Sequence, residues 1–267
     1  MEVIPQILTS DPEDFLDTAV KLKEYGYTEV NLNLGCPSGT VAAKGKGAGF
    51  LKDTEKLARF LGEVSEGMER ENLHFSIKTR VGVESEEEFQ TLLGLYNQCP
   101  LTELIIHPRV LKDFYKYNVR MNAFKEGFEK SRHSVCYNGD IFRRKDYDRL
   151  VKEYPDLDKI MMGRGIMMNP FLMEEIADGT SQKVSGKMSA ARKADRLEKF
   201  HRLLCDGYTH VMSGDRPVLF KMKELWGFLI HSCPEEEKLM KKIRKAQHLA
   251  EYEGVVSELF CRMREHE

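Results

Sequence analysis

Two spacings of hydrophobic residues alternate along residues 1–180. Short apolar runs, typical of buried strands, are each followed by a longer stretch in which apolar residues recur at helical spacing. Successive apolar runs lie very roughly 30 residues apart, which is the length of a βα unit. The predicted strands are residues 3–8, 29–33, 73–79, 103–107, 133–137 and 158–162, and the predicted helices begin near residues 10, 53, 85, 143 and 169.

Local signals mark where several of these helices begin. Ser10 with Glu13, and Ser85 with Glu88, show the Ser-x-x-Glu pattern of a capping box. Pro170 stands where the first turn of a helix needs no backbone donor. These signals predict helix starts at the same places as the hydrophobic spacing.

Six βα units in series predict a parallel sheet with helices outside it, which is either a TIM (β/α)8 barrel or a doubly wound sheet. In a barrel the C-terminal ends of all strands converge on one mouth, whereas a doubly wound sheet uses a single crevice. Every predicted strand ends in a polar residue, so we predict an α/β fold of the TIM (β/α)8 type. The strand-end residues are Gln6, Cys36, Lys78 with Arg80, His107 with Arg109, Asn138 with Asp140, and Gly163 with Arg164 and Gly165.

The number of strands limits this barrel. A (β/α)8 barrel needs eight strands and the pattern predicts six, so about 60 residues would be missing at about 30 per βα unit. The sequence also starts abruptly, in what looks like the beginning of a strand. We therefore expect only the last six βα units, in a chain that is a fragment or mis-started product of a longer protein or that closes its sheet in an unusual way.

Composition indicates an ordinary folded protein. The 267 residues are 41% hydrophobic and 31% charged, which is enough for the core of one large domain or of one large and one small domain. No apolar run approaches the roughly 20 residues of a membrane span, and no basic segment followed by an apolar one opens the chain. We therefore expect a cytoplasmic protein without a membrane partner.

The six cysteines are widely scattered, without a CxxC pair or a Cys/His cluster. This pattern argues against a structural zinc site and a disulfide framework, so we expect free thiols and no metal. Cys36 is distinctive because Gly35 and Pro37 bracket it where the second predicted strand ends, and both neighbours restrict or shape the backbone around the thiol. The alternative role for such a cysteine is that of a small buried hydrophobe in a turn.

The net charge changes sign along the chain. It is −6 over residues 1–180 and +4 over residues 181–267, which together make the overall −2. We therefore expect a domain boundary near residue 180. A basic second part is typical of a polyanionic partner, although an excess of four charges also fits a solvated helical face. The basic residues at helical spacing are Arg192, Lys193, Arg196, Lys199 and Arg202, followed by Lys241, Lys242, Arg244 and Lys245.

Short motifs run along the chain in a defined order. They are Asn33–Pro37, Val41, Gly45–Gly49, Ile77–Gly82, His107–Arg109, Tyr115–Lys116, Asn138–Ile141, Met162–Gly165 and Asn169–Pro170. In this order and spacing the set resembles the flavin-dependent tRNA-dihydrouridine synthase family, although each motif alone is weak. The basic helical tail with Lys221, Lys223 and Trp226 is similar to the C-terminal tRNA-binding helical domain of that family.

The resemblance implies a partial TIM-barrel catalytic domain that binds FMN over residues 1–180, and a helical, basic tRNA-binding domain over residues 181–267. Enzymes of this family take reducing equivalents from NADPH and reduce the C5=C6 bond of a uridine extruded from folded tRNA. The flavin delivers hydride to C6, and C5 must then be protonated. Cys36 is the implied general acid, because a thiol with an ordinary pKa near 8.5 is mostly protonated at neutral pH.

The resemblance also implies which strand-end residues bind the cofactor. Gln6 would contact the pyrimidine edge of the flavin, and Lys78 would place positive charge near N1 and O2. The remaining residues implied to bind the cofactor are His107, then Asn138, Gly139 and Asp140 on the ribityl and phosphate side, and Gly163 and Arg164 at the phosphate.

Four other residues are implied to face the substrate, either the uracil or the nearby tRNA backbone. They are Asn33, Arg80, Arg109 and Tyr115. For each residue with an implied role, the alternative is a polar group that is simply satisfied at a strand end. The glycine-containing segment 38–49 resembles the flexible loop that folds over the bound base in the family.

The chain also departs from the family pattern. Pro108 and Val110 stand where the family commonly has Gly and Thr, and Tyr117 replaces the glycine usual after Tyr-Lys. The first two strands of the family barrel have no counterpart. Two other functions therefore stay open: a non-catalytic tRNA-binding remnant, or an FMN-dependent TIM-barrel oxidoreductase that acts on a small pyrimidine or an enone. Neither the modified uridine nor the oligomeric state follows from the sequence.

Overall fold

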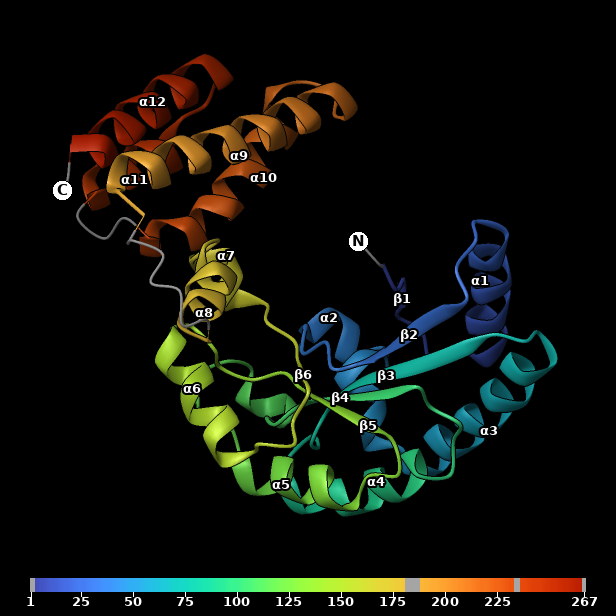
Figure 1. The fold of residues 1–267 in the computed structure, drawn as a ribbon. Coiled ribbons are helices and arrows are strands. Elements are labelled where there is room, and N and C mark those ends of the chain that lie inside the picture. The colour runs from blue at the N-terminus through green and yellow to red at the C-terminus, as the bar shows by residue number, and fades with distance from the viewer. Residues whose placement is uncertain (1–2, 181–187, 233–235, 266–267) are drawn as a thin grey trace. The chain divides into compact units, whose positions relative to one another are not determined.

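The computed structural model describes residues 3–180, 188–232 and 236–265 (Figure 1). The chain divides into two compact units. The sheet unit comprises Met1–Gly139 and Glu153–Met161, and the helical unit comprises Asp140–Lys152 and Met162–Glu267. The domain boundary predicted at residue 180 stays a prediction, since the segment that follows it, 181–187, lies outside the described residues.

The sheet unit contains six parallel strands that pair in sequence order. A doubly wound sheet reverses its strand order at a switch point, whereas a barrel does not. The sequential order confirms the predicted fold class, six βα units of the TIM-barrel type followed by helices. The strands are β1 (Gln6–Ile7), β2 (Glu29–Leu34), β3 (His74–Arg80), β4 (Glu103–His107), β5 (Ser134–Tyr137) and β6 (Lys159–Ile160).

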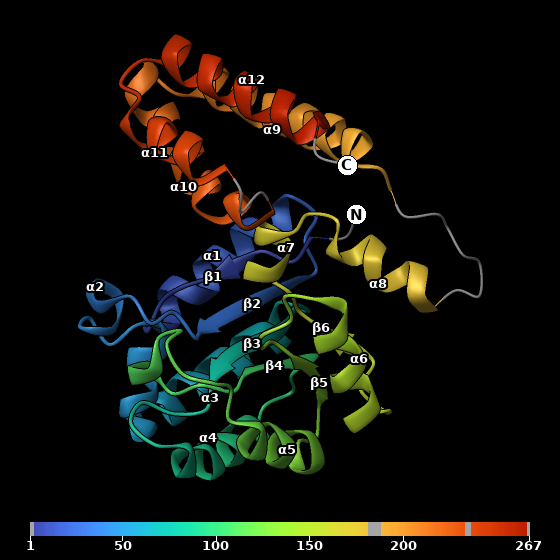
Figure 2. The same ribbon diagram turned by 90° about the vertical axis from the view of Figure 1, so that its left-hand side faces the viewer.

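Helices follow the first four strands of the sheet unit, as βα units require, and Figures 1 and 2 show α3, α4 and α5 along one side of the sheet. Each presents an apolar stripe: the buried face of α3 includes Leu57, Phe60, Leu61 and Val64. The helices are α1 (Pro12–Glu24), α2 (Gly39–Ala42), α3 (Thr54–Arg70), α4 (Phe89–Tyr96) and α5 (Met121–Lys130), with 3-10 turns at Gly47–Lys52, Glu86–Glu88 and Leu111–Asp113.

Aromatic side chains fill the space between the sheet and its helices. Phe15 of α1 meets Phe60 of α3 and Phe75 of β3 edge-to-face, with ring centroids 6.0 Å and 6.3 Å apart. Phe50 contacts Phe60 at 5.3 Å in the same geometry. Such pairs contribute about 0.5–1.5 kcal/mol beyond area burial. The segment that carries Phe50 is thereby attached to the core.

The helix-start signals agree with the structure in one case and differ in two. Ser85 and Glu88 form the predicted capping box. At α1 the prediction was wrong by one residue, because the Asp11 carboxylate caps the helix by accepting from the Asp14 amide, 3.1 Å away. Asp11 is favoured because Pro12 follows it at the first helical position. Pro170 precedes its helix, which begins at Leu172.

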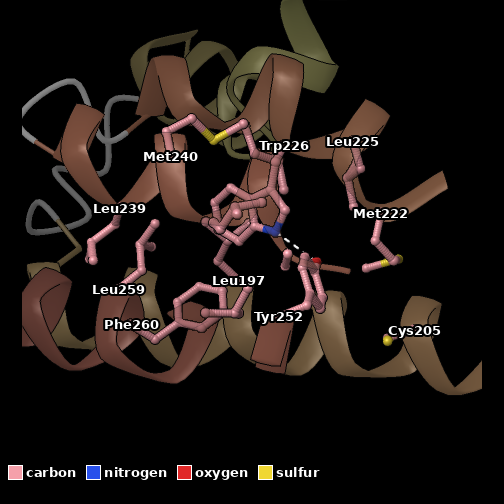
Figure 3. Close-up of a cluster of buried hydrophobic side chains, with 14 of the residues drawn as sticks. Leu197, Cys205, Met222, Leu225, Trp226, Leu239, Met240, Tyr252, Leu259 and Phe260 are labelled. Atoms are coloured by element: carbon pink, nitrogen blue, oxygen red, sulfur yellow. Dashed lines mark hydrogen bonds between the residues drawn. The ribbon is translucent and has the colours of Figure 1, made fainter. Parts of the chain in front are cut away.

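The helical unit is built from long helices around one core, in which α9 and α12 lie side by side (Figure 2). Its core gathers aromatic and aliphatic side chains around Trp226, as Figure 3 shows. The helices are α6 (Arg144–Glu153), whose last residue belongs to the sheet unit, α7 (Arg164–Met168), α8 (Leu172–Thr180), α9 (Ala190–Val211), α10 (Asp215–Leu229), α11 (Glu237–Lys245) and α12 (Leu249–Glu265), with a 3-10 turn at Ile230–Ser232.

Three polar side chains lie inside this core and satisfy one another. Trp226 donates its indole N–H to the Tyr252 hydroxyl at 2.8 Å, and that hydroxyl lies 2.5 Å from Nε2 of His201. Because the hydroxyl has one proton to donate, a neutral His201 accepts it. The buried ring therefore has its partner only while it is uncharged.

Acidification is expected to destabilise the helical unit through His201. Burial lowers the pKa of His201 from 6.5 to about 4, so between these values the unfolded chain binds a proton that the folded chain does not. Stability then falls as the pH falls, by about 1.4 kcal/mol per pH unit. Urea titrations at pH 7 and pH 5, followed by the fluorescence of Trp226, the only tryptophan, measure this loss.

His201→Gln is the matched variant for this measurement. It keeps an acceptor for the Tyr252 hydroxyl and removes the titrating group. The free energy lost between pH 7 and pH 5 is expected to be smaller in the variant by about 2 kcal/mol. Equal losses in the two proteins would contradict the assignment.

Candidate active site

The structure distributes the predicted site residues over both units. The helical unit contains Asp140, Gly163 and Arg164. In the sheet unit, strand register brings several of the others together, because Asn33 stands opposite Lys78 and Arg80 opposite His107. The predicted residues in the sheet unit are Gln6, Asn33, Cys36, Lys78, Arg80, His107, Arg109, Tyr115, Asn138 and Gly139.

Side-chain amides form a relay across the first three strands. Asn33 Nδ2 donates to Gln6 Oε1, and Gln6 Nε2 donates to Asn31 Oδ1, both at 2.7 Å. Asn31 Nδ2 continues to Ser76 Oγ at 2.9 Å. The relay fixes the orientation of the Gln6 amide. Sequence reasoning missed Asn31 and Ser76, although an asparagine inside the buried strand β2 was a usable signal.

The backbone around Cys36 is held from several directions. Asn33 Oδ1 accepts the amides of Gly35, at 3.0 Å, and of Cys36, at 2.9 Å. The Cys36 carbonyl accepts from the Ala48 amide at 3.0 Å. A Cβ on Gly47 would lie 2.9 Å from the Cys36 Cβ, so only glycine permits this approach. The thiol is half-buried.

The segment after Cys36 is more regular than predicted. Residues 38–49 were expected to form a flexible loop, and they fold into α2 and the start of the 3-10 turn Gly47–Lys52. A Cβ on Gly49 would lie 2.3 Å from the Ala42 carbonyl oxygen. The glycines therefore serve close packing of the backbone here.

Lys78 is a desolvated cation beside residues 35–37, named the cysteine turn here. Burial lowers the pKa of its ammonium group to about 8, and the positive charge of Arg80 acts in the same direction. The thiols of Cys136 and Cys36 act in the opposite direction, and a Cβ built on Gly35, next to Cys36, would lie 3.8 Å from Lys78 Nζ. A negatively charged ligand placed beside Lys78 would restore its protonated form.

Arg80 is fully buried, and its guanidinium binds backbone carbonyls. Nε donates to Gly35 O at 3.0 Å, Nη1 to Val110 O at 2.8 Å, and Nη2 to Phe114 O at 2.9 Å. Its Cζ lies 5.4 Å from the centroid of the Tyr115 ring. Burial lowers the pKa of Arg80, and Tyr115 opposes that shift. The three carbonyls belong to the cysteine turn and to the loop after β4.

Residues 110–120, named the aromatic loop here, follow β4. Asp113 anchors this loop: its carboxylate accepts from the Val110 amide at 3.1 Å and from two N–H groups of Arg120 at 2.9 Å and 3.0 Å. The hydrogen bond from Arg120 lowers the pKa of Asp113. Phe114 has φ of +49°, a conformation unfavourable for a residue with a side chain. Its carbonyl and that of Val110 are the two carbonyls of this loop that Arg80 binds.

His107 and Arg109 are buried where β4 ends, and the aromatic loop covers them. Arg109 Nη1 lies 3.2 Å from His107 Nε2, and Arg109 Nε donates to Tyr117 O at 2.8 Å. The Tyr115 ring stacks on His107 with centroids 5.9 Å apart and is 49% exposed. Of these three predicted site residues, Tyr115 offers an accessible side chain.

Asn138 and Gly139 directly follow β5 in the sheet unit. Asn138 Nδ2 donates to Met161 O at 2.9 Å, which ties the end of β5 to the chain after β6. A Cβ on Gly139 would lie 2.0 Å from the Tyr137 hydroxyl. A side chain at position 139 would therefore have to displace the buried Tyr137 ring.

In the helical unit, Arg164 opens α7 and binds a carboxylate. Its Nη2 donates to Asp140 Oδ1 at 2.7 Å, and its Cζ lies 5.2 Å from the centroid of the Phe142 ring. Gly163 is the residue before the helix, and no heavy atom lies within 4 Å of a Cβ built on it. A Cβ on Gly165 would lie 1.9 Å from Ile141 O. The structure thus joins Asp140 and Arg164.

Two other kinds of feature are absent from the described part of the chain. Among its residues, no group of three or more His, Cys, Asp or Glu side chains is arranged to hold a metal ion. Within the same ranges, no helix is both long and apolar enough to cross a membrane. Five cysteines are free thiols, and Cys233 lies outside the described residues.

Gly47→Ala is expected to displace the cysteine turn. The new Cβ would clash with Cys36, whereas Gly45, which has a similar positive φ, has no heavy atom within 4 Å of an added Cβ. The control is Gly45→Ala. Both substitutions carry the cost of the left-handed backbone, and only Gly47→Ala adds overpacking of about 1–3 kcal/mol. Unfolding free energies and the rate of Cys36 alkylation by iodoacetamide, read by peptide mass spectrometry, compare the two. Equal effects at both positions would contradict the steric argument.

Lys78→Met is expected to stabilise the chain in the absence of ligands. The folded-state pKa of about 8 lies below the ordinary 10.5, so the buried charge costs stability in full below pH 8, and the cost fades between pH 8 and 10.5. Removing the charge should raise the free energy of unfolding by about 1–3 kcal/mol at pH 7. Urea titrations at pH 7 and pH 10 measure the gain, which should shrink at pH 10. A gain independent of pH would contradict the assignment.

Comparison with known proteins places the chain in a family. Residues 1–261 match the family model described as "Dihydrouridine synthase (Dus)". A "Probable tRNA-dihydrouridine synthase" of Staphylococcus aureus is 31% identical over 179 residues, which cover 65% of this chain and 53% of that protein. A protein of the same description from Staphylococcus epidermidis is 30% identical over 210 residues, which cover 74% and 63%.

The chain thus spans about half the length of the curated relatives from Staphylococcus aureus that it matches. Among solved structures, "Morphinone reductase" matches 63% of this chain and 48% of its own, with a TM-score of 0.45 and 17% identity. Because the family match extends over nearly the whole chain, the protein belongs to the dihydrouridine synthase family.

Proposed function

We propose that this protein is a tRNA-dihydrouridine synthase that reduces the C5=C6 bond of a uridine in tRNA, with FMN as cofactor, NADPH as reductant and Cys36 as general acid. The observation that carries the proposal is the cysteine turn. Its backbone is held by Asn33 and Gly47 at the end of β2, next to the desolvated Lys78 at the end of β3. Family membership and the names of the relatives support the same reaction.

The residues of the sheet unit fit the isoalloxazine end of FMN. Lys78 supplies a cation whose lowered pKa favours an anionic neighbour, as the N1 and O2 edge of a reduced flavin is. Gln6 supplies an amide whose orientation is already set by Asn31 and Asn33. His107, buried beside Arg109, completes this group of cofactor residues.

The phosphate end of FMN would be held by residues after β5 and β6. In this proposal Asn138, Gly139 and Asp140 line the ribityl side, and Gly163 and Arg164 bind the phosphate. Arg164 has a guanidinium that already pairs with the Asp140 carboxylate, and a guanidinium can serve two anions through its separate N–H groups. Bound FMN would supply the hydride that is added to C6 of the uracil.

The chain itself supplies the proton. Hydride addition at C6 leaves an electron pair at C5, and the Cys36 thiol donates its proton there, forming the C5–H bond and a thiolate. Nearby Lys78 stabilises that thiolate by its positive charge. Positioning and proton donation are thus the two tasks of the cysteine turn.

The uracil and the adjoining tRNA backbone are assigned to Asn33, Arg80, Arg109 and Tyr115. Tyr115, half-exposed on the aromatic loop, is suited to stacking against a base. The two arginines are buried and bound to carbonyls, so they would contribute through the shape and charge of the pocket. A cytoplasmic location, where tRNA is modified, belongs to the same proposal.

The helical unit is proposed to bind the tRNA phosphates, whose neutralisation supplies much of the affinity of RNA-binding proteins. Some of its basic residues are engaged in ion pairs within the chain: Lys193 with Glu175, Arg196 with Glu174, Arg202 with Glu198, Lys241 with Glu237, and Lys242 with Glu258. Arg192, Lys199, Arg244 and Lys245 lie on the exposed surface and are the preferred candidates for phosphate contacts.

Cys36→Ala is expected to keep FMN binding and to lose dihydrouridine formation by about 10²–10⁴-fold, the usual contribution of a general acid. The assay uses the purified chain with FMN, NADPH and an unmodified tRNA transcript, and quantifies dihydrouridine by nucleoside mass spectrometry. Cys261→Ala is the matched control, because Cys261 is an exposed thiol on α12. Unchanged turnover in Cys36→Ala would refute the acid role.

The same assay separates the two alternative functions. A chain that binds tRNA and shows no flavin absorbance after incubation with FMN would be a tRNA-binding remnant. A chain that binds FMN and reduces a free pyrimidine or an enone, while leaving tRNA uridine unchanged, would be an oxidoreductase of another class.

A further inference from the structure

The peptide unit between Gly35 and Cys36 is held at both of its polar atoms. Asn33 Oδ1 accepts the Cys36 amide N–H at 2.9 Å, and Arg80 Nε donates to the Gly35 carbonyl at 3.0 Å. Rotation of this peptide, which would carry the thiol with it, breaks both hydrogen bonds. Because the cysteine side chain bonds only weakly, its position depends on this backbone.

The other two hydrogen bonds of Arg80 extend to the aromatic loop. Nη1 and Nη2 donate to the carbonyls of Val110 and Phe114, at 2.8 Å and 2.9 Å. A guanidinium is planar and rigid, so it fixes the relative positions of the groups that it binds. One buried side chain therefore sets the distance between the cysteine turn and the aromatic loop, which lies about 75 residues later in the chain.

The aromatic loop is itself anchored, at a distance from Cys36. Asp113 binds the Val110 amide and forms a two-pronged ion pair with Arg120. Phe114 is held in its left-handed conformation between this anchor and Arg80. A change in the anchor would move the carbonyls that Arg80 binds, and through Arg80 the Gly35 carbonyl.

We propose that Arg80 is a positioning residue for Cys36, which couples the cysteine turn to the aromatic loop, and that it acts through the backbone instead of by contact with the uracil. The importance of the thiol rests on the proposed function. The coupling can be measured without it, because iodoacetamide alkylation of Cys36 needs neither FMN nor tRNA. Failure of the coupling and failure of the proposed reaction are therefore distinguishable.

Arg80→Lys is the first test. A lysine ammonium cannot span three carbonyls, so the cysteine turn should loosen, and Cys36 should be alkylated faster by about three- to tenfold, the equivalent of one hydrogen bond. Peptide mass spectrometry resolves Cys36 from the other cysteines, and circular dichroism melting checks that the variant is folded. An unchanged alkylation rate in a folded variant would overturn the proposal.

Arg109→Lys is the matched control. Arg109 is equally buried and also binds a carbonyl of the aromatic loop, that of Tyr117, to which two of its N–H groups donate. We expect this variant to leave the Cys36 alkylation rate within about twofold of the unmodified chain, since the hydrogen bonds from Arg80 to Gly35, Val110 and Phe114 stay in place. An equal acceleration in both variants would show general loosening and would overturn the specific role of Arg80.

Asp113→Asn tests the coupling from the aromatic loop, because it weakens the anchor of that loop and leaves the Arg80 side chain unchanged. The neutral amide weakens the pair with Arg120, which hydrogen exchange of residues 110–120 would report. We expect faster alkylation of Cys36 in this variant and no further acceleration when it is combined with Arg80→Lys, because residues that act as a unit are non-additive. A loosened loop with an unchanged Cys36 rate would overturn the proposal, even if Arg80→Lys fails to fold.

Discussion

In-register pairing of parallel strands is the constraint on which the candidate site depends. Lys78 and Arg80 face the same side of β3, and Asn33 of β2 lies beside Lys78 because of the strand register. The alternate residues Phe75 and Ile77 are buried on the other face. A slip of β3 by one residue would exchange the two faces, so packing of the apolar side chains fixes where the two cations stand.

Lys78 and Arg80 are two cations on the same face of β3, so their charges repel each other. The fold stabilises the two charges to different extents. Arg80 distributes its charge over three carbonyl dipoles, and five N–H donors in a plane make this possible. Lys78 is a compact ammonium in a desolvated position, and its pKa falls to about 8 as a result. Part of the remaining cost is borne by Lys78, where an anionic partner would favour the protonated form of the amine.

Much of the fold could be predicted from the sequence, because strands and helices leave periodic patterns in neighbouring residues. The six strands and the helices that begin near Asp53 and Ser85 are of this kind. Helix α5 was not predicted: it has no side-chain cap, and its stripe of Ala123, Phe124 and Gly127 is short. The helix start at Asp11 was misplaced because two capping residues compete within one turn.

The candidate site was predictable as a set of strand-end residues, whereas the partners of those residues were not. Arg80 and Asn33 were expected to face a substrate, and in the structure both bind the main chain of the cysteine turn: Arg80 donates to the Gly35 carbonyl, and Asn33 Oδ1 accepts the Cys36 amide. Arg80 and Gly35 are 45 residues apart in the chain, and their contact exists only once β2 and β3 have paired. A prediction from the sequence names the chemical group, but the register decides what that group binds.

These contacts also explain why a thiol at this place needs so much backbone support. An acid that must reach one carbon atom of its substrate loses about 100-fold in rate when it is misplaced by about 1 Å. A serine or an aspartate can be oriented by strong hydrogen bonds to its own side chain, and a cysteine cannot. Precision must then come from the main chain, and Asn33, Gly47 and Arg80 each act on main-chain atoms or the Cβ of the cysteine turn. Polar residues that could bind a ligand are used instead to hold the residue that is proposed to do the chemistry.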